Sequence, residues 1–274
     1  MYPRWISGTG IRPSIYEFNW NSWQAKNLVL WLPLDSTVNY HQVGDGVDIV
    51  FPGVSVAAGI TPKGDAHFGL APRLDGSSTI EFTSETISAT QDLTWSVWAM
   101  TEDLITSNNR RLWSHGTFTN TLSYVGGTPG SFLYIDDSGG FGSSFSFEPV
   151  AFQPFHIVIA KLGSNSTPQA WVNGVEYTVT SARTPQGGTG ILYVGSNTGT
   201  NRFWLGHIYE IRRYNRYFTD MEAKLLFNPR TRWELYMSPT RRSWMEVVAP
   251  VGGRIWKLAG EGGGLAGRSA GLIG

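Results

Sequence analysis

The sequence predicts an all-β protein built as a two-sheet antiparallel sandwich, with one short helix near residues 219–227 and extended N- and C-terminal arms. Aromatic residues make up 14% of the chain, and aromatic side chains pack well on a pleated, half-buried surface. The 33 Gly and 14 Pro suit a fold with many turns. Short apolar or alternating segments recur about every dozen residues with no helical pattern between them, which is typical of such a sandwich.

The strands are predicted from period-2 alternation or from short apolar runs bounded by turn residues. In chain order these segments are 28–32, 79–82, 93–100, 131–135, 155–160, 170–177, 190–195 and 204–214. The alternation is strict over 93–100, with Trp95 and Val97 expected on one face and Trp98 and Met100 on the other. Asn173-Gly174 lies between two apolar runs and predicts a hairpin, because both central residues of a type I′ turn need a positive φ.

The helix is predicted from its capping residues. Thr219 and Glu222 form a capping box, and Asn228-Pro229 ends the segment. A helix of about two turns is unstable alone, so we expect it to lie against the sandwich.

Composition divides the chain into an N-terminal aromatic arm at 1–26, the sandwich at 27–236, and a C-terminal arm at 237–274 that is Arg/Trp-rich and then Gly-rich. The net charge is zero, but residues 1–201 hold 9 basic against 15 acidic residues and residues 202–274 hold 12 against 6. The asymmetry predicts a basic face that meets an acidic partner, including another copy of the chain. Chance is the alternative.

Several function classes are disfavoured by what the sequence lacks. With no Cys, disulfides and thiolate chemistry are excluded. No apolar run reaches the roughly 18 residues that span a bilayer, and the N-terminus does not read as a signal peptide, so we expect no membrane insertion. The five His residues show no metal-ligand spacing, and His156 is interpreted as a hydrogen-bonded core residue.

Six segments, in this order, resemble the laminin-G-like jelly roll of the concanavalin A-like superfamily. They are Leu28–Asp35, Gly69–Ser77 (resembling "G-x-A-x-x-F-D-G-S"), Leu93–Trp98, Phe155–Val158 ("W-H-H-V"), Trp171–Gly174 ("Y-V-D-G") and Phe203–Arg216 ("F-x-G-x-I-D-E-V-R-I-Y-N-R"). The resemblance covers 28 to about 228 and implies a concanavalin A-like sandwich.

The sequence departs from this pattern where Tyr209 replaces an Asp and Arg213 an aliphatic residue. The Tyr removes one candidate calcium ligand, so we predict no metal and no cofactor. Calcium at Asp35 and Asp75 remains the alternative, although an Asp at a turn usually accepts from local backbone amides.

The segment from Leu226 to Trp244 is similar to the sequence that follows such domains in tailed-bacteriophage and prophage virion proteins. This resemblance implies a location on the particle surface, as a capsid decoration, head-fibre or tail-associated protein.

Catalysis and nucleic-acid binding are both poor fits. The glucanase pattern E-x-D-x-x-E, which would place two carboxylates across a sugar, is absent, so we predict no enzyme activity and no catalytic residue. The Arg residues between 202 and 242 are interpreted as a solvated sheet face rather than a nucleic-acid surface.

Two hypotheses remain. In the favoured one the arms contact other virion proteins or copies of the chain, because exposed Trp usually marks an interface. The candidate assembly contacts are Trp5, Trp20, Trp23, Trp244, Arg254 and Trp256. Folding of the arms onto their own sandwich is the alternative, more plausible for residues 12–25.

The second hypothesis is glycan binding, in which a sugar stacks on aromatic rings at a sandwich rim. Its candidates are Trp113, Tyr124 and Tyr134, although alternating aromatic residues are more often core.

Overall fold

The fold is known from a computed structural model. It describes residues 17–19, 21–32, 34, 55–56, 61–65, 69–103, 110–116, 120–125, 131–135, 142–163, 167–180, 187–197, 202–237, 243–248 and 254–259.

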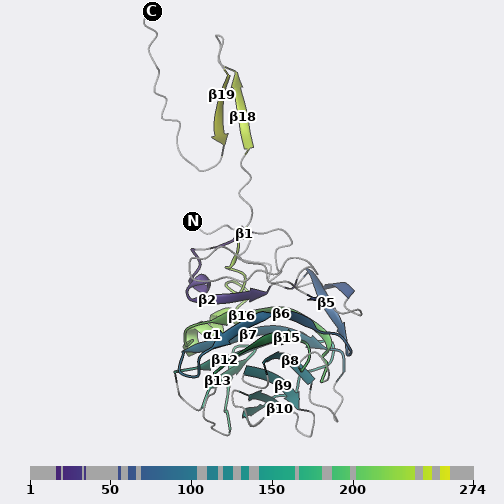
Figure 1. Ribbon diagram of the computed structural model, residues 1–274. Coiled ribbons are helices and arrows are strands. Elements are labelled where there is room, and N and C mark those ends of the chain that lie inside the picture. Colours follow the sequence, from purple (N-terminus) through teal and green to yellow (C-terminus); the bar gives the residue numbers. More distant parts are fainter. Residues whose placement is uncertain are drawn as a thin grey trace, which may run out of the picture.

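Two antiparallel sheets form the predicted sandwich (Figure 1). The seven-stranded sheet consists, in spatial order, of β11 (Ser143–Ser146), β10 (Ser131–Ile135), β9 (Asn120–Val125), β8 (Arg110–His115), β15 (Gly188–Val194), β6 (Ile80–Ile87) and β3 (Ser55–Val56). The eight-stranded sheet consists of β14 (Val175–Tyr177), β13 (Gln169–Val172), β12 (Phe155–Lys161), β7 (Leu93–Thr101), β16 (Leu205–Tyr214), β5 (Gly69–Asp75) and β4 (Thr61–Asp65), with β2 (Leu28–Leu32) also paired to β16.

The inner core lies between the two sheets and follows the predicted alternation. Trp95, Val97 and their alternate neighbours on β7 are fully buried there. The Trp95 ring stacks on the Trp113 ring of the opposite sheet, with centroids 4.9 Å apart. Burying two rings of this size in contact contributes strongly to stability, because each removes about 150–250 Å² from water.

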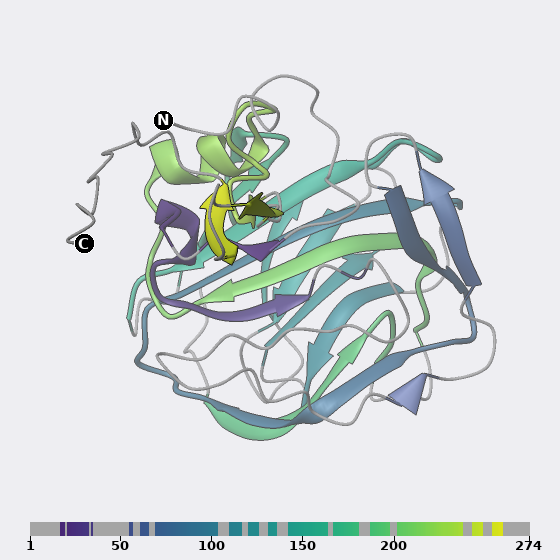
Figure 2. The ribbon, with the colours of Figure 1, turned by 90° about the horizontal axis from the view of Figure 1, so that it is seen from above.

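The outer face of the eight-stranded sheet is buried as well. Trp98 and Met100, predicted on the second face of β7, belong to a separate apolar cluster with residues of β16, α1 (Asp220–Phe227) and the segment after it. Figure 2 shows α1 (light green) and the 3₁₀ helix η1 (Trp23–Ala25; purple) over this side of the sheet. The protein is therefore three-layered where these elements cover the sheet.

Two features predicted from local chemistry, a hairpin turn and the start of the helix, are confirmed. Asn173 and Gly174 have φ values of 51° and 75° and connect β13 to β14. Helix α1 begins with the complete capping box, in which Thr219 accepts from the Glu222 backbone N–H and Glu222 accepts from Thr219.

The terminal segments 17–26 and 228–237, which we call the terminal clasp, hold each other against the outer face. Strand β1 (Glu17–Phe18) pairs with β17 (Tyr236–Met237), and Asn19 N–H donates to the Leu235 carbonyl over 2.8 Å. The buried Gln24 side chain donates to the Thr231 carbonyl over 2.5 Å and accepts from Arg212 over 2.6 Å. Residues 17–19 and 21–25 thus fold onto their own sandwich, as the alternative for the N-terminal arm had it.

The C-terminal arm contains strands that the sequence pattern did not predict. Strand β18 (Ser243–Val248) pairs with β19 (Arg254–Ala259), and among the described strands each pairs only with the other. Figure 1 shows this hairpin away from both sheets. An isolated two-stranded hairpin is at best marginally stable in water.

The interpretation of the Arg residues as a solvated face is wrong for three of them. Arg212 and Arg213 of β16 are only 2% and 6% exposed, and Arg232 is 9% exposed. Arg212 forms an ion pair with Glu210 over 2.8 Å, and Arg213 lies 5.6 Å from the Trp95 ring centroid. Gln24, which accepts from Arg212, and Trp95, beside Arg213, lie far from these Arg residues in the sequence, so period alone could not reveal the burial.

No described helix is long and apolar enough to cross a membrane.

His156 is the buried, hydrogen-bonded residue expected. Its Nε2 lies 2.8 Å from the Ser96 hydroxyl, and its ring stacks on Trp98. Burial, together with the nearby charges of Arg212 and Arg232, holds the pKa of His156 well below its usual range.

This lowered pKa predicts a loss of stability in acid. Below about pH 6.5 the unfolded chain binds a proton at His156 that the folded chain does not, so the free energy of unfolding falls as the pH falls toward the folded pKa. The slope from this group approaches about 1.4 kcal/mol per pH unit. Urea unfolding measured between about pH 7.5 and pH 5.5 checks it, and His156→Gln should lose this part of the slope. An unchanged slope in the variant would contradict the assignment.

Candidate functional site

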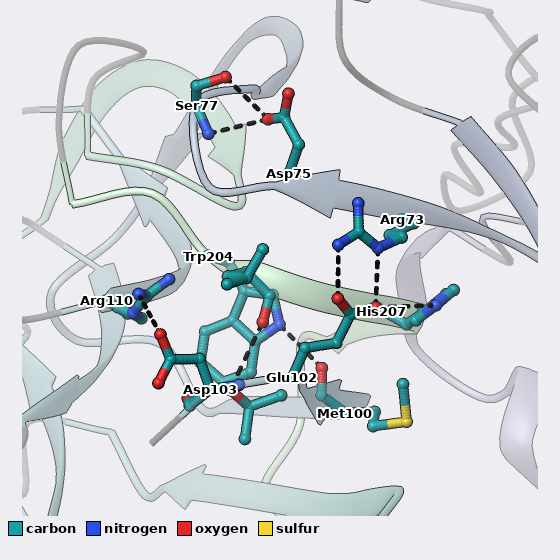
Figure 3. A network of polar contacts seen from close by, with 11 residues as sticks. Arg73, Asp75, Ser77, Met100, Glu102, Asp103, Arg110, Trp204 and His207 are labelled. Carbon is teal, nitrogen blue, oxygen red and sulfur yellow. Dashed lines mark hydrogen bonds and ion pairs between the residues drawn. The ribbon is translucent and has the colours of Figure 1, made fainter. Parts of the chain in front are cut away.

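The candidate site is a group of charged side chains at one rim of the sandwich, which we call the rim cluster (Figure 3). It consists of Arg73, Glu102, Asp103, Arg110 and His207. They come from β5, from the turn after β7, from the first residue of β8 and from β16, so four segments meet there.

Glu102 accepts a two-pronged contact from Arg73, whose Nε and Nη2 lie 2.8 and 2.5 Å from the two carboxylate oxygens. His207 Nε2 lies 3.8 Å from Glu102 Oε1. The Glu102 side chain is 10% exposed and that of Arg73 31%. The hydrogen bond to Glu102 raises the pKa of Arg73 above its ordinary value, so the guanidinium stays charged.

Asp103 and Arg110 form the second ion pair, with 3.4 Å between Oδ2 and Nη2. Thr101 shapes the turn that carries Asp103, since its hydroxyl donates to the Asp103 carbonyl over 2.6 Å. The side chains of Asp103 and Arg110 are 26% and 13% exposed, so both reach solvent.

A close backbone contact fixes the rim. Trp204 Nε1 donates to the Met100 carbonyl over 3.1 Å, and Gly206 has a φ of 133°. A Cβ at Gly206 would lie 2.2 Å from the Met100 carbonyl oxygen, so only glycine lets β16 approach β7 here.

Asp75, a residue of the calcium alternative, serves its own turn. It accepts from the Ser77 backbone N–H over 2.8 Å and from the hydroxyls of Ser77 and Ser78. Burial raises the pKa of Asp75, but these hydrogen bonds outweigh it and leave the pKa below its ordinary value. Within the described ranges no three His, Asp or Glu residues gather as metal ligands, while Asp35 lies outside them.

The rim cluster is equipped for binding. Each of its two carboxylates accepts from a guanidinium. The same ion pairs present hydrogen-bond donors and acceptors side by side at an accessible rim.

The three residues predicted to stack on a sugar are not brought to this rim as a group. Trp113 is 0% and Tyr124 3% exposed, and both belong to the inner core. Their rings offer no face to a ligand, and the alternative that alternating aromatic residues are core holds for both. Tyr134 pairs with Leu122 of β9, and its side chain lies outside the described part of the structure.

The candidate assembly contacts divide into three groups. Trp5 and Trp20 lie outside the described residues. Trp23 is half-buried in the terminal clasp, 6.1 Å from the Phe218 ring, and therefore packs within its own chain. The remaining three lie in the hairpin, where Trp244 pairs with Leu258, Trp256 with Glu246 and Arg254 with Val248.

Sequence reasoning missed the rim cluster entirely. Arg73 and Glu102 are 29 residues apart, and His207 is more distant still. No short-range spacing encodes such a group, because the sheet order alone brings β5, β7 and β16 together.

Comparisons with known proteins agree with this fold. Residues 74–224 match the Laminin_G_3 family model, described as the concanavalin A-like lectin/glucanases superfamily. The binding domain of Paraclostridial Mosquitocidal Protein 1 is similar at a TM-score of 0.55 and 17% identity, over 74% of this chain and 52% of that one. The botulinum neurotoxin type G receptor binding domain is similar at 0.54 and 13%, over 74% and 51%.

The chain thus spans about half the length of these toxin domains. Domain 4 of AbnA, a GH43 extracellular arabinanase from Geobacillus stearothermophilus, in complex with arabinotriose, has a TM-score of 0.49 at 18% identity, over 74% and 98%. No match was found among curated protein sequences.

The Glu102–Arg73 pair gives an asymmetric prediction. Arg73→Gln removes the guanidinium from the mostly buried Glu102 carboxylate, and should lower the free energy of unfolding by about 1–3 kcal/mol. Glu102→Gln should cost less, because it leaves behind Arg73, which is more exposed and can be solvated by water. Urea denaturation of both variants tests this order, and equal effects would show that the pair does not depend on Glu102 burial.

Proposed function

The chain belongs to the concanavalin A-like lectin/glucanases superfamily, and we propose that it is a non-enzymatic structural protein of a virion. In this proposal the sandwich is displayed on the particle, as a capsid decoration, head-fibre or tail-associated protein, and the terminal segments contact neighbouring subunits. The similarity of the segment after the sandwich to tailed-bacteriophage and prophage virion proteins supports the virion context.

The observation that carries the proposal is the terminal clasp. Glu17 pairs with Met237, so the segments before and after the sandwich leave it from adjacent points. Both β1 and β17 lie on the side of the eight-stranded sheet that is already covered. Attachment through these segments would leave the rim cluster and the seven-stranded sheet free to face outward.

The hairpin of β18 and β19 supports the same proposal. Its strands pair only with each other among the described strands, and each has a free edge whose backbone groups can pair with another chain. A partner that completes this small sheet would supply the stability that two strands alone lack. Copies of the same chain and other virion proteins are the proposed partners.

A second candidate function is carbohydrate binding, which is compatible with display on a particle. The rim cluster favours it, because Arg73 and Asp103 present a donor and an acceptor with side chains 31% and 26% exposed. Ligands rich in hydroxyl groups use both kinds of partner. Host or environmental glycans are the proposed ligands.

Truncation separates the sandwich from its attachment. Removal of residues 238–274 keeps β17 and the terminal clasp, so the protein should stay folded with a nearly unchanged thermal midpoint. Particles produced with this variant in place of the full chain should, after purification, contain no truncated protein by mass spectrometry. Particles produced with the full-length chain should contain it.

The control is removal of residues 228–274, which deletes one of the two segments of the clasp, with the Arg232 carbonyl and the buried Trp233, and should lower the thermal midpoint markedly. Normal incorporation of the shorter truncation would overturn the role of the C-terminal segment. Absence of the full-length protein from particles would overturn the virion proposal itself.

A further inference from the structure

The turn Pro149–Pro154, which we call the Phe152 turn, presents apolar side chains to solvent beside the rim cluster. Phe152 is 67% and Val150 56% exposed. The aromatic residues on either side behave differently, since Phe155 is 2% exposed and Phe147 packs against the inner core. The segment is thus anchored at both ends and projects its middle.

The backbone of this turn is held in an unfavourable conformation. Phe152 has a φ of 62°, a left-handed value that costs a residue with a side chain about 1–2 kcal/mol. The turn is fixed by Phe152 N–H donating to the Thr101 carbonyl over 2.8 Å, and by Gln153 N–H donating to the Val150 carbonyl over 3.1 Å. The strained backbone and the exposed aromatic ring both reduce the stability of the folded chain. Strained residues of this kind are often found at binding sites.

The anchor of the turn is also the anchor of the rim cluster. Thr101 accepts from Phe152 through its carbonyl, while its hydroxyl contacts both the N–H and the carbonyl of Asp103. The Phe152 turn therefore lies next to the turn that carries Glu102 and Asp103. Arg110 completes this surface through its ion pair with Asp103.

We propose that the Phe152 turn and the Asp103–Arg110 pair form a saccharide-binding site, with the Phe152 ring as the stacking platform. The inference rests on the second candidate function, carbohydrate binding, and assigns its site. A sugar ring has an apolar face of C–H groups, which packs on an aromatic ring, and hydroxyls at its edge, which bond to carboxylate and guanidinium groups. Two prolines and two backbone hydrogen bonds preorganise the turn, so binding orders little further chain.

The charges beside the turn favour a saccharide over a lipid surface. Glu148, directly before the turn, is exposed, and Glu102 and Asp103 directly follow Thr101, which accepts from Phe152. Carboxylates at this position oppose an anionic headgroup region, whereas neutral saccharide hydroxyls donate to them. Other exposed apolar side chains, such as Met221 on α1 and Leu162 after β12, do not have the positive φ of Phe152, and single exposed apolar residues are common.

The test uses the full chain on a microarray of neutral and acidic oligosaccharides, followed by calorimetry with the strongest binder. Phe152→Asn removes the ring and supplies a residue that tolerates the left-handed conformation, so its thermal midpoint should be equal or higher. Its affinity should fall about tenfold or more, since the stacked ring is lost. Phe152→Tyr keeps the ring and should retain binding, and Met221→Ala is the matched exposed control that should leave it unchanged.

The outcomes are distinct. Saccharide binding that survives Phe152→Asn overturns the site while leaving carbohydrate binding in place. No binding to any saccharide overturns carbohydrate binding and this site together. Sedimentation with phosphatidylcholine–phosphatidylserine vesicles that Phe152→Asn abolishes, without saccharide binding, would assign the turn to a lipid surface instead and overturn the proposal.

Discussion

The structure depends on the burial of both faces of the eight-stranded sheet. Every residue of β7 and of β12 is buried, so one face of this sheet lies against the other sheet and the opposite face needs a cover. Helix α1 and the terminal clasp supply it. The cover holds polar groups as well as apolar ones, because Glu210 accepts from Trp31 over 2.7 Å and Arg212 binds Gln24 of the clasp. A buried charge is tolerated only when it is paired, so these contacts fix where the terminal segments lie.

This constraint links stability to the proposed function. The residues of a terminal segment that cover the outer face are not available to contact a neighbouring subunit. Trp23 is such a residue, because it packs within its own chain. Among the described contacts, the strands that follow β17 do not cover the outer face, and these two strands pair only with each other. The division between the segment that covers the sheet and the segment that is available for other contacts falls at β17.

Much of the fold could be predicted because its signals are local. The alternation of 93–100, the positive φ required at Asn173-Gly174 and the capping box at Thr219 each depend on residues within one element, and all three are confirmed. The burial of Trp113 and of Arg212 could not be predicted in this way. An aromatic residue on a strand can face the core or the solvent, and an Arg can be exposed or paired beneath a cover, and only the sheet order and the partner strand decide between them.

The rim cluster and the Phe152 turn show the same limit from the functional side. Their residues come from β5, the ends of β7 and β12, β8 and β16, and their sequence neighbours give no motif. The only local hint at Phe152 is its position between two prolines, which is consistent with a rigid turn but not with a particular side-chain exposure. Function at such a rim is therefore decided by which loops the sheet order brings together. Most aromatic residues of this sandwich pack in its core or in its outer cover. An exposed aromatic ring on a strained, anchored turn is therefore a better indication of function than the aromatic content of the whole chain.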